Sequence, residues 1–269
     1  MREILEKLSL RNVAGRTQAG RGFYNAIERL KPAPLPRANH SIFALSVDET
    51  VEAMSRHALA SSFCLPEQMA ERLACFAEAA ELKHESLADR FYLYQLDQQR
   101  FRSLPLAYVD QPLASLDVQL LTEDPFFHAV FERYLGFAPK GVEARIWFSF
   151  ANVEASESQR RAHNQTIDYH YDAGFGKTTF FYASFYLSDV DLAAGPHSLF
   201  LGSHKRKRLD WLFRSARRSR EELIAFYGEQ SEKTLIGPAG TGFLEDASCF
   251  HRAAIPTSKN RLILQLRFY

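Results

Sequence analysis

His170 and Asp172 place an imidazole and a carboxylate two residues apart in the chain. In an extended strand successive side chains alternate between the two faces, so these two side chains point the same way. Side by side they can hold two positions on one metal ion. A facial triad for non-haem iron(II) needs a second histidine and leaves the remaining coordination positions open. Because a local residue could not reach the opposite edge of the ion, we expect this histidine on a distant strand.

Two histidines could complete such a site. His204 and His251 are each followed ten residues later by an arginine, Arg214 and Arg261 respectively. His204 lies in a polar, basic segment that is typical of a turn leading into a helix. His251 follows a strand-like run, and Arg261 begins an alternating apolar strand, so the sequence favours His251. A second interpretation stays open, because a short His-x-Asp motif also arises by chance and the pair could simply be hydrogen-bonded within a strand.

Length, charge and cysteine content narrow the class of protein. A chain of 269 residues is long enough for one large β-barrel-type domain with flanking helices. The net charge of +1 gives no global field that would favour nucleic acid or a membrane surface. The three cysteines have no metal-binding spacing and fit a reducing compartment. The chain has no signal-peptide core and no apolar run of about 20 residues. We therefore expect a cytoplasmic protein without a transmembrane segment, and the sequence indicates no oligomeric state.

The first half of the chain predicts mainly helices. Apolar side chains recur at helical spacing in three segments, 49–59, 66–82 and 124–135. Asp124 is suited to cap the third of these helices and Gly136 to end it. Residues 91–96 are a candidate strand, and residues 1–40 are expected to form a peripheral arm.

The second half predicts short apolar strands separated by turns, a pattern typical of an antiparallel sandwich or jelly roll. The expected strands lie within 143–154, 178–188, 195–204 and 261–268. Residues 155–166 predict a mobile loop at the lip of a site, and 209–227 predict a helix. We expect a single α+β domain, mainly β with flanking helices, in which 1–140 give helical support and outer strands and 141–269 form the core.

Four pieces of the chain, taken in order, resemble the phytanoyl-CoA dioxygenase-like family of iron(II)/2-oxoglutarate-dependent oxygenases. They are His170-x-Asp172, the run from Gly195-Pro-His to Gly202-Ser-His204, the run Gly240-x-Gly-Phe-Leu-Glu-Asp246 that leads to His251, and Arg261. The resemblance covers roughly residues 124–269. Each piece is weak alone, and their order makes the resemblance specific.

The resemblance implies a double-stranded β-helix, the jelly-roll or cupin-like fold. The iron ligands would be His170, Asp172 and His251. Arg261 would bind the C5 carboxylate of 2-oxoglutarate, since the planar guanidinium can donate two parallel hydrogen bonds to a carboxylate. The other co-substrate contacts would come from Tyr182 and Ser184. Three protein ligands would leave room on Fe(II) for 2-oxoglutarate and then O₂.

The activity that this family implies is hydroxylation of a C–H bond with decarboxylation of 2-oxoglutarate to succinate. The substrate would be a small or a lipid- or sugar-linked molecule that carries an anionic group. Three residues are candidate contacts for this group: Arg214, Arg217 and Arg218. These belong to a stretch, 205–220, with eight basic residues. The same stretch could instead contact an anionic membrane surface or be a solvated helix face.

Two other functions stay open from the sequence. A cupin-like metalloprotein with non-oxidative chemistry would bind metal without depending on 2-oxoglutarate, because jelly rolls host many functions. An inactive binding module of the same fold would lack a metal ligand, and the chain carries all three expected ligands.

Overall fold

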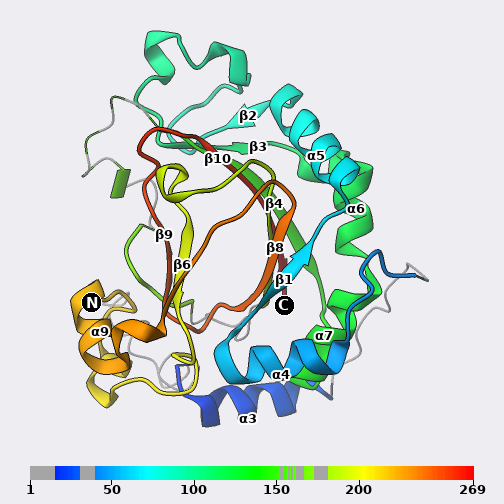
Figure 1. The fold of residues 1–269 in the computed structure, drawn as a ribbon, viewed down its shortest axis with the longest axis vertical. Helices are drawn as coiled ribbons and strands as arrows, with labels where there is room; N and C mark the ends of the chain where they lie inside the picture. The colour runs from blue at the N-terminus through cyan, green and yellow to red at the C-terminus, as the bar shows by residue number, and fades with distance from the viewer. Residues whose placement is uncertain are drawn as a thin grey trace.

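Two antiparallel sheets face each other across the interior of the protein (Figure 1). The computed structural model describes residues 16–30, 40–151, 154, 156, 158, 160–161, 167–172 and 181–269. Within them the larger sheet has seven strands. In spatial order these are β1 (Leu59–Cys64), β8 (Thr241–Asp246), β5 (Phe181–Tyr186), β10 (Arg261–Phe268), β4 (Val142–Ser149), β3 (Leu106–Val109) and β2 (Leu82–Lys83).

The smaller sheet closes the other side of the interior. Its three described strands, in spatial order, are β7 (Glu232–Leu235), β6 (His197–Phe200) and β9 (His251–Ala253). The chain crosses between the sheets, so that strands distant in sequence become neighbours. This arrangement confirms the prediction of a mainly β, jelly-roll core with flanking helices.

Helices cover the outer face of the larger sheet (Figure 1). They are α4 (Val47–His57), α5 (Glu67–Ala79), α6 (Leu116–Thr122) and α7 (Pro125–Leu135). The predicted caps of α7 are confirmed: the Asp124 side chain accepts from the Phe126 amide, and Gly136 ends the helix with φ 80°. The helices at 49–59 and 66–82 are confirmed as α4 and α5 with slightly shifted ends.

Strand alternation gives the larger sheet two unlike faces. On β10 the apolar residues Leu262, Leu264 and Leu266 pack against the helices. The alternate residues of β10 face the smaller sheet. They pair with residues of β5 that face the same way: Arg267 lies opposite Tyr182, and Gln265 lies opposite Ser184. The barrel interior is therefore lined with polar and aromatic side chains.

Two predicted elements are wrong. Residues 91–96 do not form a strand: Phe91 makes a single bridge to Leu82, and η1 (Leu93–Gln95) follows. The helix predicted at 209–227 is two pieces, η5 (Leu209–Phe213) and α9 (Arg220–Tyr227). Ser219 interrupts the run because its side chain accepts from the Glu222 amide while Glu222 accepts from the Ser219 amide, which starts a new helix.

The remaining elements lie on the surface. The peripheral arm is described over residues 16–30 and contains α3 (Gln18–Glu28). The short 3₁₀ helices not yet named are η2 (Gln99–Phe101), η3 (Pro112–Ala114), η4 (Leu192–Ala194) and η6 (Glu229–Ser231). The loop predicted at 155–166 lies almost wholly outside the described residues. None of the described helices is both long enough and apolar enough to cross a membrane.

Candidate metal centre

His170, Asp172 and His251 come together inside the barrel. His170 and His251 exchange backbone hydrogen bonds of 3.0 and 2.8 Å, and their ring centroids lie 4.5 Å apart. One potential ligand atom from each of the three residues lies within 4.8 Å of the other two. The structure thus assembles the two histidines and one carboxylate that the sequence predicted, with His251 supplied by the distant strand β9.

The hydrogen bonds of both imidazoles orient them for metal binding. Nδ1 of His170 lies 2.8 Å from the Asp168 carbonyl, and Nδ1 of His251 lies 3.0 Å from the Cys249 carbonyl. A carbonyl can only accept, so each Nδ1 carries the proton and each Nε2 keeps a free lone pair. The Asp172 carboxylate oxygens lie 4.0 and 3.9 Å from these two Nε2 atoms. With metal–nitrogen bonds of about 2.1 Å, two ligands of one ion can be at most about 4.2 Å apart, so each histidine lies within the distance at which it can share an ion with Asp172.

The electrostatics of the two histidines also suit a cation. Burial, followed by the charge of the neighbouring His251, lowers the pKa of His170 to about 4. Burial also lowers the pKa of His251, but the carboxylates of Glu245 and Asp172 outweigh it, so the net shift is upward. The centre therefore disfavours two protonated histidines and carries carboxylates that attract one positive charge. A divalent metal that displaces the proton satisfies the same carboxylates.

Tyr182, which the sequence predicted as a contact of 2-oxoglutarate, contacts a predicted metal ligand. Its hydroxyl donates a 2.6 Å hydrogen bond to the Asp172 carboxylate. Burial, followed by the charge of Asp172, raises the pKa of Tyr182 well above its usual value, so the phenol stays protonated and remains a donor. Tyr182 therefore fixes the orientation of one carboxylate oxygen of Asp172.

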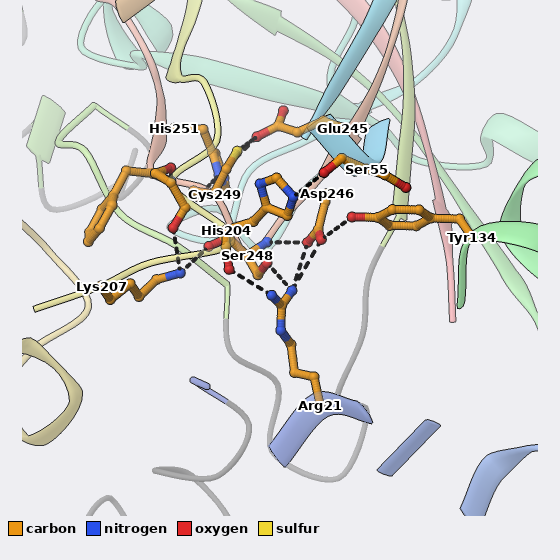
Figure 2. Close-up of polar contacts among 12 residues, drawn as sticks. Arg21, Ser55, Tyr134, His204, Lys207, Glu245, Asp246, Ser248, Cys249 and His251 are labelled. Atoms are coloured by element: carbon orange, nitrogen blue, oxygen red, sulfur yellow. Dashed lines mark hydrogen bonds and ion pairs between the residues drawn. The ribbon is translucent and has the colours of Figure 1, made fainter. Parts of the chain in front are cut away.

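Glu245, on β8, is a residue of this centre that the sequence did not single out. Its side chain is 1% exposed. One carboxylate oxygen lies 3.0 Å from His251 Nδ1 and accepts from the Cys249 thiol at 3.2 Å, as Figure 2 shows. The other lies 2.7 Å from His197 Nε2. Burial raises the pKa of Glu245, but the two histidines and the thiol hydrogen bond outweigh it and bring the pKa to about 2. Glu245 is thus a buried anion directly behind one proposed metal ligand.

Arg261 is a buried cation that lacks a counter-charge among the described residues. It is 1% exposed, and its Nη2 donates to Ser149 Oγ at 3.0 Å. Its Nε and Nη1 are buried and have no hydrogen-bond partner. Burial lowers its pKa to about 10. An uncompensated buried charge costs several kcal/mol, so this position favours an anionic ligand.

Two further interior residues bear on the same ligand. Ser184 Oγ is also buried without a partner, and in register it lies between Tyr182 and the Arg261 end of the sheet. Arg267, on the same face of β10, differs because its Nη1 lies 3.6 Å from Glu143. The unpaired guanidinium on this strand is therefore that of Arg261.

The three arginines predicted to contact substrate are not brought to the metal cluster by the contacts described. Arg218 is buried and packs over the Trp211 ring at 5.2 Å. Trp211 clusters with Tyr169 and Tyr171, whose side chains alternate with those of His170 and Asp172. Arg214 and Arg217 are exposed, and Arg214 lies 4.0 Å from Asp210. Their substrate role stays a prediction.

Comparisons with known proteins identify the fold. No protein-family model and no curated protein matches the sequence. Among solved structures, SnoN, a non-haem α-ketoglutarate-dependent epimerase from nogalamycin biosynthesis, matches with a TM-score of 0.50 and 19% identity over 82% of each chain. SnoK, a carbocyclase from the same biosynthesis, matches with a TM-score of 0.50 and 17% identity over 88% of this chain and 87% of its own.

HygX from Streptomyces hygroscopicus, solved with nickel, 2-oxoglutarate and hygromycin B, matches with a TM-score of 0.53 and 15% identity. The match covers 83% of this chain and 87% of HygX. These structural neighbours are the kind of protein that the sequence resemblance indicated. The chain has the double-stranded β-helix fold of the non-haem iron and 2-oxoglutarate-dependent enzymes.

Proposed function

We propose that this protein is an iron(II)- and 2-oxoglutarate-dependent oxygenase that acts on a small molecule. One observation carries the proposal: a single barrel interior holds both a two-histidine, one-carboxylate cluster and a buried arginine with two unpartnered nitrogens. The cluster supplies donors that suit non-haem iron and leaves coordination positions open. The arginine supplies the missing partner for a dicarboxylate that also chelates the metal.

Each residue has a separate task in this proposal. His170, Asp172 and His251 would hold the iron. Tyr182 keeps the Asp172 carboxylate in place, and Glu245 holds the His251 ring from behind. These two contacts orient Asp172 and His251 before the ion binds.

The co-substrate would extend from the metal toward Arg261. The Arg261 fork would pair with the C5 carboxylate, and Ser184 Oγ is placed to donate one further hydrogen bond. Bound iron with 2-oxoglutarate and O₂ would supply an oxidation coupled to the formation of succinate. The buried walls around Arg261 would exclude water from this half of the site.

We propose hydroxylation of a C–H bond as the reaction. A small-molecule substrate is supported by the neighbours SnoN and HygX, which were crystallised with nogalamycin RO and hygromycin B respectively. Because SnoN and SnoK are an epimerase and a carbocyclase, mass analysis of the product is the measurement that distinguishes oxygen insertion from these outcomes.

Anaerobic titration tests the proposal. Iron(II) added to the metal-free protein, followed by 2-oxoglutarate, should produce the visible metal-to-ligand charge-transfer band of the chelated co-substrate. In a competition assay, succinate should displace 2-oxoglutarate from Arg261. Metal binding that is unaffected by 2-oxoglutarate would refute the proposal and favour non-oxidative cupin-like chemistry. No metal binding at all would favour a binding module.

A further inference from the structure

Helix α3 is attached to the protein by its polar side. Arg21 is buried, and its Nη1 lies 3.1 Å from Asp246 Oδ2 (Figure 2). Its Nη2 donates to the His204 carbonyl at 2.8 Å. About two turns further on, Glu28 pairs with Lys140. Surface helices usually bury an apolar stripe, so this attachment through charged residues is the reverse of the ordinary arrangement.

The apolar side of α3 consequently faces outward. Phe23, Ile27 and Leu30 recur at the spacing of one helix face, the last of them in the turn after the helix. Phe23 is 65% exposed and Leu30 is 86% exposed. Ala19 and Ala26 lie on the same side and are also exposed. Isolated exposed apolar residues need no explanation, whereas a continuous stripe of them indicates a contact surface.

A basic segment, residues 205–217, is attached to the N-terminal half of α3. Arg16, just before α3, donates to the carbonyls of Leu212 and Arg214 at 2.5 and 2.8 Å. Together with the contact of Arg21 to His204, this bond ties the segment 204–214 to α3. Leu209 and Phe213 of this segment are exposed too. Five surrounding basic side chains are exposed: Lys205, Arg206, Arg208, Arg214 and Arg217. Only one acidic residue, Asp210, lies between residues 205 and 217.

We infer that this face, made of α3 and residues 205–217, docks onto an anionic membrane surface. An amphipathic helix whose apolar side chains are flanked by lysine and arginine lies at the lipid interface, where the apolar residues enter the headgroup boundary. The basic residues add attraction to anionic lipids. A second copy of the chain is a poorer occupant, because it would bring two sets of like charges together. The inference does not depend on the chemistry of the metal centre.

Vesicle binding by the full-length protein tests the inference. We expect co-sedimentation with vesicles of equal parts phosphatidylcholine and phosphatidylglycerol, and much weaker binding to phosphatidylcholine alone. Replacing Phe23, Ile27 and Leu30 with serine should weaken binding at least about tenfold. Replacing Lys205 and Arg206 with glutamine should weaken it about ten- to thirtyfold at low salt, since each basic residue near the surface contributes about fivefold.

A matched control lies on α6, where Leu116 and Leu120 are exposed one turn apart beside Asp117. Serine at these two positions removes exposed apolar surface from a helix whose Asp117 is neutralised by Arg72, outside the proposed docking face, and should leave binding unchanged. Every replaced side chain is exposed, so the melting temperatures should stay close to that of the wild type. The inference would be overturned if the wild-type protein did not bind anionic vesicles, or if the triple α3 variant bound them as well as the wild type. A dimer that the triple variant dissociates would assign the face to a second copy instead.

Discussion

Glu245→Gln should weaken metal binding while leaving the barrel folded. Glutamine keeps the shape of the side chain, and its amide oxygen can take the place of the carboxylate oxygen that now lies 3.0 Å from His251 Nδ1. Its amide nitrogen can face His197 Nε2, which lies 2.7 Å from the other oxygen. The change therefore removes the negative charge behind His251 and preserves the packing.

The size of the effect follows from the electrostatic contact that is lost. Glu245 and His251 attract each other by charge, whereas the hydrogen bond of His251 Nδ1 goes to the Cys249 carbonyl, so the variant loses an electrostatic contact behind the ligand and keeps its shape. This loss corresponds to about tenfold in metal affinity, the lower end of the range for residues that support metal ligands. Glu245→Ala should approach about a hundredfold, because it leaves His251 Nδ1 with the Cys249 carbonyl alone.

The assay is an anaerobic competition between the protein and a metal-binding dye, with cobalt(II) as a spectroscopic substitute for iron(II). The cobalt d–d spectrum should shift in Glu245→Gln, since a weaker His251 donor changes the ligand field. Glu143→Gln is the matched control: it also neutralises a carboxylate on the interior face of the larger sheet, but one that lies beside Arg145 and Arg267. If Glu245→Gln has the metal affinity and spectrum of the wild type while His251→Ala abolishes binding, Glu245 only fills space.

Three other perturbations separate the parts of the site. His251→Ala should abolish the thermal shift that metal produces, whereas His204→Ala should retain it because His204 Nε2 contacts the Ser55 carbonyl instead of the cluster; the opposite result would reassign the third ligand. Arg261→Lys should weaken 2-oxoglutarate about ten- to a hundredfold with little change in metal affinity, and an equal loss in Arg267→Lys would assign the co-substrate to Arg267. Burial raises the pKa of Asp246, but Arg21, His204 and the hydrogen bonds from Ser248 outweigh it and hold the pKa well below its ordinary value. A carboxyl with a depressed pKa stabilises the fold fully above its unfolded pKa and loses this contribution as pH falls through the folded value. The difference in Tm between wild type and Asp246→Asn should therefore be constant above about pH 4 and shrink below it, and a difference that does not change with pH would contradict this assignment.

Local signals in the sequence predicted the elements that local chemistry determines. The Asp124 cap, Pro125 and the ending Gly136 predicted α7 because they satisfy or avoid the unpaired amides and carbonyls at helix ends. The failed helix at 209–227 carried an equally local signal, Ser219 followed three residues later by Glu222, which marks the start of a helix. Apolar residues recur at helical spacing on both sides of Ser219, so the spacing alone predicted one continuous helix.

Contacts between distant strands were harder to predict. The pairing of His170 with His251 could be expected because a metal needs donors from both sides, and the alternation of His170 and Asp172 is intrinsic to a strand. Glu245 gave no such reason, since nothing in its own segment reveals that His251 and His197 surround it. Its signal was a carboxylate directly after the buried pair Phe243 and Leu244, because a charge there requires partners.

The two acidic residues that end β8 fix His251 from opposite sides of the sheet. Glu245 points into the barrel and contacts His251 itself, whereas the next residue, Asp246, points outward to Tyr134 and Arg21 (Figure 2). Asp246 also accepts from the Ser248 amide at 2.9 Å and so shapes the turn that leads to His251. A metal site needs its ligands held before the ion arrives, since freedom in a ligand is lost on binding. The Glu-Asp dipeptide supplies this restraint with one carboxylate on the ring and one on the backbone that carries it.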